Sequence, residues 1–223
     1  MTMRFPLKTA LTLVLLAAVA IGTSGCNYVV LLGYLIGGPP SIEPEFDSMT
    51  GESLTDKDVI VAVVCYAPKE VLYDYSRVDR DIAKYVSYQM TAKKIKVLNP
   101  DLVQKWLDEN SNWDEPSEIG EALEATHVVY IDITKYTLYE ENSHELYRGR
   151  SEVDVTVYEM DEDGEGEPIY STELLSRFPL AAAQDASEIS RPGFQARYHR
   201  RLSTEVGWLF YEHYNGDNIP DAT

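Results

Sequence analysis

The sequence predicts an α/β (α+β) domain, with a mixed sheet of about five strands and helices packed against it. Three observations lead to this fold class. Val59–Tyr66 is a continuous, mostly β-branched apolar run, and Ser76–Lys94 carries apolar residues at helical spacing. Three runs with strand character then follow between residues 128 and 175.

The first half of the domain combines strands with amphipathic helices. Val59–Tyr66 is typical of a strand buried on both faces, so the parallel part of the sheet should lie there. Ser76–Lys94 should be a helix capped by Ser76, and Ile95–Leu98 a short strand. A second helix should begin at Pro100, with Asn99 as its cap, and end near Asn110. Ser117–Ala125 should be a third helix, capped by Ser117.

The second half is dominated by strands. The expected strands are Val128–Leu138, Leu146–Glu159 and Pro168–Leu175, with Asp161–Glu167 as the turn of a hairpin. Gln195–Tyr214 should be the closing helix. Its apolar stripe should be buried against the sheet; the stripe comprises Tyr198, Leu202, Val206, Leu209 and Phe210. The opposite face should be exposed; it carries Arg197, Arg200, Arg201 and Glu205.

The start of the chain has the layout of a bacterial lipoprotein precursor. Arg4 and Lys8 precede the apolar run Ala10–Ile21, which is too short to span a membrane, and a small-residue stretch then leads to Cys26. The sequence therefore predicts a signal peptide over residues 1–25 and lipid on Cys26. Two alternatives remain: signal cleavage nearby with Cys26 as a free thiol, or a disulfide between Cys26 and Cys65. Cys65 otherwise reads as a buried thiol of the core.

A tether should separate this anchor from the domain. The apolar stretch Tyr28–Ile36 could lie in the membrane interface, pack on the domain, or belong to one uncleaved membrane segment with the residues before it. Gly37–Pro44 continues neither a helix nor a central strand, and Glu43–Asp56 should be extended or loop. The expected organisation is an anchor and tether over residues 26–57, one domain over 58–215, and a tail over 216–223.

Charge bears on the class of partner. The formal charge is −18 and becomes −20 once Arg4 and Lys8 leave with the signal. Such a field repels nucleic acid, so the expected partners are the membrane, reached through lipid on Cys26, and an envelope protein or a second copy of the chain. The expected location is the cell envelope, with the domain facing the periplasm.

Two segments carry a resemblance to known envelope proteins. KVLNPDLVQKWL (residues 96–107) and ALEATHVVYIDIT (residues 122–134) resemble the lipoprotein domains of the curli-secretion-channel type, the penicillin-binding-protein activator lipoproteins and the amino-terminal domain of the Tol translocation protein. Thr126 or His127 stands where those families have an acidic residue. The GPP tether resembles uncharacterised lipoproteins of planctomycete-type bacteria. The resemblance covers roughly Val59–Leu175 and implies an interaction or assembly role rather than an enzymatic one.

The sequence carries no motif with the spacing of a known metal or catalytic site. The four histidines, His127, His144, His199 and His213, form no HxH or HxxxH pair, so no metal or cofactor is assigned to them. The acids of Asp161–Glu167 could hold Ca²⁺, but they lack EF-hand spacing and read more simply as a solvated turn. No GxSxG motif and no phosphate-binding glycine pattern follows a strand of the domain.

A cationic group lies at the start of the closing helix of this acidic chain. It comprises Arg191, Arg197, His199, Arg200 and Arg201. It could dock an anionic partner, or it could be neutralised by the abundant acids. The leading hypothesis is therefore a non-catalytic envelope lipoprotein. The alternative is an envelope hydrolase or a ligand-binding protein whose site the sequence does not expose.

Overall fold

A computed structural model describes residues 33–38, 40–214 and 216–217 of the chain. The chain divides into two compact units, Met1–Ser41 and Ile42–Thr223. Within the described part of the first unit, residues 33–37 are helical and exposed. β1 (Ser41–Ile42) is a two-residue strand at the boundary. The predicted signal over residues 1–25 and the lipid-bearing Cys26 lie outside the described residues.

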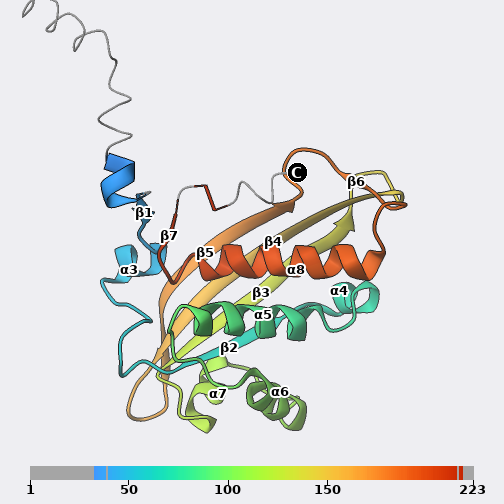
Figure 1. Cartoon of the computed structure of the whole chain (residues 1–223). Coiled ribbons are helices and arrows are strands. Elements are labelled where there is room, and N and C mark those ends of the chain that lie inside the picture. The colour runs from blue at the N-terminus through green and yellow to red at the C-terminus, as the bar shows by residue number, and fades with distance from the viewer. Residues whose placement is uncertain (1–32, 39, 215, 218–223) are drawn as a thin grey trace, which may run out of the picture. The chain divides into compact units, whose positions relative to one another are not determined.

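The second unit is built on a mixed sheet of five strands, which confirms the predicted fold class (Figure 1). Its strands are β2 (Val61–Tyr66), β3 (His127–Tyr139), β4 (Leu146–Met160), β5 (Gly166–Phe178) and β6 (Gln184–Asp185). The order is β2-β3-β4-β5, and β6 pairs with β4. β2 runs parallel to β3 while the other pairs are antiparallel, so the parallel part lies where the sequence predicts it.

Helices cover both faces of this sheet. They are α3 (Glu45–Thr50), α4 (Lys69–Asp74), α5 (Val78–Ala92), α6 (Pro100–Glu109), α7 (Pro116–Ala122) and α8 (Arg191–Gly207), followed by the short strand β7 (His213–Tyr214). α5 and α8 lie side by side across one face (Figure 1). α6 and α7 pack against the other face, at the β2 end.

The alternation of side chains along the strands produces two hydrophobic clusters. The larger contains Val63 and Val155 from the strands and Ile82 and Leu202 from α5 and α8. The smaller contains Val64 of β2 together with Val103 of α6 and Ile119 of α7. α6 packs on β2, and α7 packs on β2 and β3 and also contacts β4 and β5. Elsewhere on this face, β4 and β5 carry polar and partly exposed side chains.

The capping residue agrees with the prediction at the start of α6 but not at the starts of α5 and α7. Asn99 caps α6 as predicted, because its side chain accepts a hydrogen bond from the Asp101 amide at 2.9 Å and Pro100 occupies the first position. The predictions for Ser76 and Ser117 are wrong. α5 begins after Arg77, whose φ of 70° is left-handed, and α7 begins after Glu115, which forms a capping box with Glu118.

Two segments before the β3–β5 strands differ from their predicted structure. Within Ile95–Leu98, Val97 forms an isolated bridge to Val61 rather than a strand. Glu43–Asp56 contains α3, and Phe46 and Leu54 are buried in the larger core cluster. The folded unit therefore begins before Asp58, because these two apolar side chains anchor an otherwise acidic segment.

The closing helix starts and ends earlier than predicted. α8 covers Arg191–Gly207, whereas the apolar spacing predicts Gln195–Tyr214. Ser190 accepts a hydrogen bond from the Gly193 amide at 3.3 Å and Pro192 fits the first turn. Leu209 and Phe210 are buried as predicted, but they follow the helix rather than belong to it.

Candidate functional site

The cationic residues of α8 do not form one patch. Arg191 donates to the Asp74 carbonyl at 2.8 Å and lies over the Tyr75 ring. Arg197 donates to the Gln184 side chain at 3.1 Å, and Arg200 is exposed. Arg191 and Arg197 therefore contact different segments of the fold and are not gathered with Arg200 into one group.

Arg201 contradicts the prediction of an exposed face. Only 5% of Arg201 is exposed, and its Nε donates to Glu205 Oε1 at 2.7 Å. Its guanidinium also lies 5.2 Å from the ring centroid of Trp208. Glu205 is itself largely buried, with 14% of its side chain exposed. The pair lies four residues apart on the helix, so the acid neutralises the base within the fold.

His199 belongs to a buried polar seam between α8, α5 and β3. Its Nε2 lies 2.8 Å from the Tyr136 hydroxyl, and its Nδ1 lies 3.9 Å from Asp81 Oδ2. Burial lowers the pKa of His199 to about 4, because the Asp81 carboxylate is too distant to offset the loss of solvent. Neutral His199 thus contributes a hydrogen bond to the core and no charge to a docking surface.

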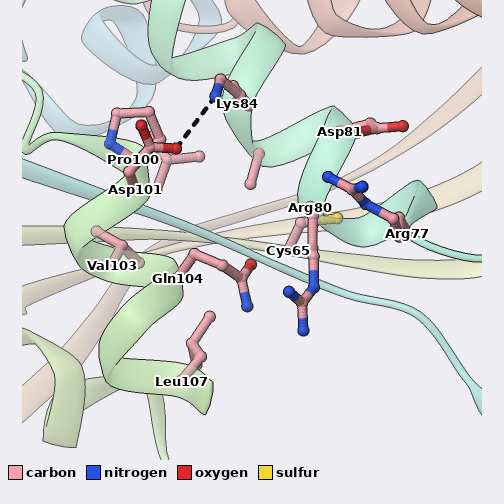
Figure 2. A pocket seen from close by; sticks show the side chains of 12 residues that line it. Cys65, Arg77, Arg80, Asp81, Lys84, Pro100, Asp101, Val103, Gln104 and Leu107 are labelled. Carbon is pink, nitrogen blue, oxygen red and sulfur yellow. Dashed lines mark hydrogen bonds and ion pairs between the residues drawn. The ribbon is translucent and has the colours of Figure 1, made fainter. Parts of the chain in front are cut away.

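A narrow cleft separates α5 from α6 above β2 (Figure 2). Its cavity of about 90 Å³ is smaller than a typical ligand pocket of roughly 300–1,000 Å³. Lys84 on its rim pairs with Asp101 at 3.1 Å, and Arg80 pairs with Asp108 at 2.7 Å. Cys65 lies at the floor, where burial raises the pKa of its thiol well above the ordinary range. This thiol is a core residue, as predicted, and not an activated nucleophile.

A wider, open cleft lies between α4, the 140–144 loop and the start of α8. Its volume is about 930 Å³, and Tyr73, Tyr139 and His144 are among the residues that line it. Two cations of this cleft are already engaged: Arg150 pairs with Glu141, and Arg191 bonds to the backbone of α4. The lining mixes aromatic and polar side chains, and both of these arginines are engaged within the fold, so the cleft does not favour the alternative of a hidden ligand site.

The outer edge of β5 is the most extended open feature of the sheet. β5 is thirteen residues long and ends the strand order at that side. Within the described residues, no hydrogen bond joins its backbone to a segment beyond β4. Leu175 is 71% exposed there, and it shares its face with Glu173 and Arg177, which are also exposed. Such an edge can pair with another strand.

Three potential metal ligands converge at one place in the described part of the chain: Glu52, His127 and Glu159. The acids of Asp161–Glu167 do not form such a group there. Asp161 Oδ1 instead accepts hydrogen bonds from the amides of Asp163 and Glu165, both at 2.9 Å, and so closes the hairpin turn. The sequence did not single out the His127 group, because its three members are far apart along the chain.

The membrane-proximal predictions are only partly covered by the structure. Of Tyr28–Ile36, residues 33–36 are described, and they are helical and exposed. No helix among the described residues is long and apolar enough to cross a membrane.

Comparison with known proteins gives weak structural likenesses. No protein-family model matches the chain, and no curated protein sequence matches it either. A hypothetical protein from Chlamydia trachomatis aligns with a TM-score of 0.44 at 15% identity, covering 67% of this chain and 93% of that one. The lipoprotein GNA1162 from Neisseria meningitidis aligns with a TM-score of 0.38 at 13% identity, covering 66% and 97%.

A third likeness is to the PelC dodecamer from Paraburkholderia phytofirmans. It aligns with a TM-score of 0.41 at 13% identity, covering 77% of this chain and 96% of that one. The structures similar to this chain thus include a bacterial lipoprotein. TM-scores at this level carry no argument about function, so the proposals below rest on the residues of the chain itself.

Proposed function

We propose that this chain is an envelope lipoprotein, anchored through lipid on Cys26, whose α/β domain is a non-catalytic assembly module. The observation that carries the proposal is the edge of β5, which no strand among the described residues pairs with and where Leu175 is exposed between Glu173 and Arg177. Exposed strand edges in proteins are usually short, charged or covered. This edge is thirteen residues long, and its charges flank a large exposed apolar side chain with opposite signs, which suits strand addition by a complementary strand.

The sequence of β5 favours a second copy of the chain as the added strand. If two β5 strands pair antiparallel about Leu175, Leu175 of one copy lies opposite Leu175 of the other. The same register places Glu173 opposite Arg177 twice, once on each side of the leucines. Opposite charges and apolar pairs directly across two antiparallel strands each contribute about 0.2–1 kcal/mol. A two-fold axis at Leu175 thus makes the edge complementary to itself.

The net charge is compatible with such local pairing. At −20 for the mature chain, two copies repel each other at long range. The formal net charge of the segment from Glu173 to Arg177 is zero, so the contact itself brings no excess of negative charge together. Lipid anchoring would further favour the dimer, because it confines the copies to one membrane surface and raises their effective concentration.

The assembly proposal is tested by cross-linking of the full lipidated chain in detergent. Leu175→Cys should form a disulfide-linked dimer under mild oxidation, because the register places the two cysteines opposite each other. Tyr73→Cys is the matched control, since Tyr73 is 90% exposed but lies on α4. It should stay monomeric on a non-reducing gel.

A charge exchange tests the register itself. Arg177→Glu should weaken the dimer in sedimentation equilibrium, because it places like charges opposite each other. Adding Glu173→Arg to that variant should restore the dimer by exchanging the two charges. A wild-type chain that sediments as a monomer at every concentration would overturn the proposal, and so would a dimer indifferent to both charge variants.

The anchor requires a separate experiment. Metabolic labelling with an alkyne fatty acid should mark the wild-type chain and leave Cys26→Ser unlabelled. Equal labelling of the two would refute acylation at Cys26 and leave the edge-strand proposal to its own test.

A further inference from the structure

Three potential ligand side chains meet where β3 begins. His127 is the first residue of β3 and lies directly opposite Glu159 of β4 in the antiparallel register. Residues opposite each other in such a pair point to the same face of the sheet. Glu52 reaches the same place from the segment that follows α3. One ligand atom from each of the three residues lies within 4.8 Å of the other two.

The imidazole of His127 is held in a fixed orientation. Only 8% of its side chain is exposed, and its Nδ1 lies 3.0 Å from Thr126 Oγ1. That oxygen accepts a hydrogen bond from the Ile60 amide at 2.8 Å and lies 3.2 Å from the Ile60 carbonyl. When the Thr126 hydroxyl donates to this carbonyl, its oxygen can accept a hydrogen bond from Nδ1–H of His127. Nε2 then carries the free lone pair, which is the arrangement found in metal-binding histidines.

Nε2 of His127 lacks a partner among the described residues and lies near two carboxylates. Nε2 is buried and has no hydrogen-bond partner in the described residues, since the nearer carboxylate oxygen, Glu52 Oε2, lies 3.7 Å away. A buried nitrogen lone pair that faces two carboxylates is unfavourable unless a hydrogen-bond donor or a cation lies between them. A water molecule that donates to Nε2, or a metal ion bound by all three groups, would satisfy this nitrogen.

We propose that Glu52, His127 and Glu159 bind a divalent first-row transition metal ion, with Zn²⁺ as the reference case. One imidazole and two carboxylates match the nitrogen and oxygen donors that Zn²⁺ accepts in three-ligand sites, with water in the fourth position. Ca²⁺ fits poorly, because it takes about six to eight oxygen ligands. The bound ion neutralises the two carboxylates around the buried nitrogen.

The geometry requires movement only of exposed side chains. Zn–N and Zn–O bonds of roughly 2.0–2.2 Å require ligand atoms closer together than 4.8 Å. Glu159 is exposed and 47% of the Glu52 side chain is exposed, so both carboxylates can rotate toward the ion while His127 stays fixed. Binding then joins the segment after α3 to β3 and β4, and it should stabilise the folded chain.

The test is titration of the full, untagged, lipidated chain with ZnCl₂ after treatment with EDTA. Calorimetry should give one ion per chain, and at about 100 times the Kd the Tm should rise by roughly 5–10 °C. The double variant Glu52→Gln/Glu159→Gln should weaken binding at least about tenfold. The matched control, Glu162→Gln/Glu165→Gln, removes two exposed carboxylates at the hairpin tip and should bind Zn²⁺ as the wild type does.

Several results would overturn the proposal. One is a wild-type chain whose Tm does not respond to Zn²⁺, Co²⁺ or Ni²⁺, which would leave Nε2 of His127 to a water molecule. Another is an equal Zn²⁺-dependent rise in the Glu52→Gln/Glu159→Gln variant, which would place the ion elsewhere. Both substitutions lie at exposed positions and preserve shape, so the comparison does not depend on a disruptive change at His127.

Discussion

The substitution Leu202→Ala tests how α8 is held against the sheet. Leu202 is completely buried on α8 and belongs to the core cluster that joins α5, α8 and the strands. Replacing it with alanine removes three carbon atoms, which corresponds to about 2.4 kcal/mol of lost burial at roughly 0.8 kcal/mol per methylene group. The remaining cavity adds to this loss, so the free energy of unfolding should fall by about 2–5 kcal/mol.

The same change can be expressed as a shift in Tm. For a domain of this size, a loss of 1 kcal/mol lowers the Tm by roughly 2–4 °C. Leu202→Ala should therefore lower the Tm by about 4–20 °C, measured by circular dichroism on the chain in detergent. The midpoint of urea unfolding should fall. The dependence of the free energy on urea concentration should hardly change, because the surface exposed on unfolding is nearly the same.

Arg200 provides the control on the same helix. It is exposed and lies two residues before Leu202, so Arg200→Glu should change the free energy of unfolding by less than about 0.5 kcal/mol. If Leu202→Ala and Arg200→Glu leave the Tm equally unmoved, α8 is not part of the folded core. The helix would then be a separate arm, and the single-core description of the second unit would fail.

Further predictions concern pH, packing and the hairpin tip. His199 has a folded-state pKa of about 4, below the ordinary 6.5, so the unfolded chain takes up its proton first as the pH falls. The free energy of unfolding should fall by up to about 3 kcal/mol between pH 6.5 and 4. In urea titrations across this pH range, His199→Gln should show a smaller fall in the free energy of unfolding. An unchanged fall would contradict the lowered pKa of His199. Gly149→Ala would place a Cβ atom 2.3 Å from the Tyr198 ring, so it should cost at least about 1–3 kcal/mol, whereas Gly37→Ala meets nothing within 4 Å and should be neutral. Replacing the acids of Asp161–Glu167 by Asn and Gln should leave the Tm unchanged or slightly higher, and Ca²⁺ should not shift it; a Ca²⁺-dependent rise lost in the variant would revive a cation site at the hairpin.

The parts of the fold that the sequence predicts are those set by local pattern. The continuous apolar run of β2 indicates burial on both faces, and the alternation of Val153, Val155 and Val157 with polar residues indicates a strand with one solvated face. The errors arise where one or two contacts outweigh the local pattern. α3 forms in an acidic segment because Phe46 is buried, and the stripe of α8 continues to Phe210 although the helix ends at Gly207.

The two sites proposed here differ in how far the sequence could reveal them. The alternation of Glu173, Leu175 and Arg177 is visible in the sequence, but only the strand order shows that β5 lies at an edge.

The group of Glu52, His127 and Glu159 joins residues that are far apart in the sequence. His127 lies opposite Glu159 because of the β3–β4 register, which two irregularities between Ile133 and Tyr139 make hard to count from sequence. Glu52 joins them only because Phe46 and Leu54 fix its segment to the core. A histidine that begins a buried strand, flanked by a threonine that can orient its ring, is the one local signal of this site. It becomes specific only when a carboxylate is found opposite it, so the register of the hairpin, rather than any motif, carries the inference.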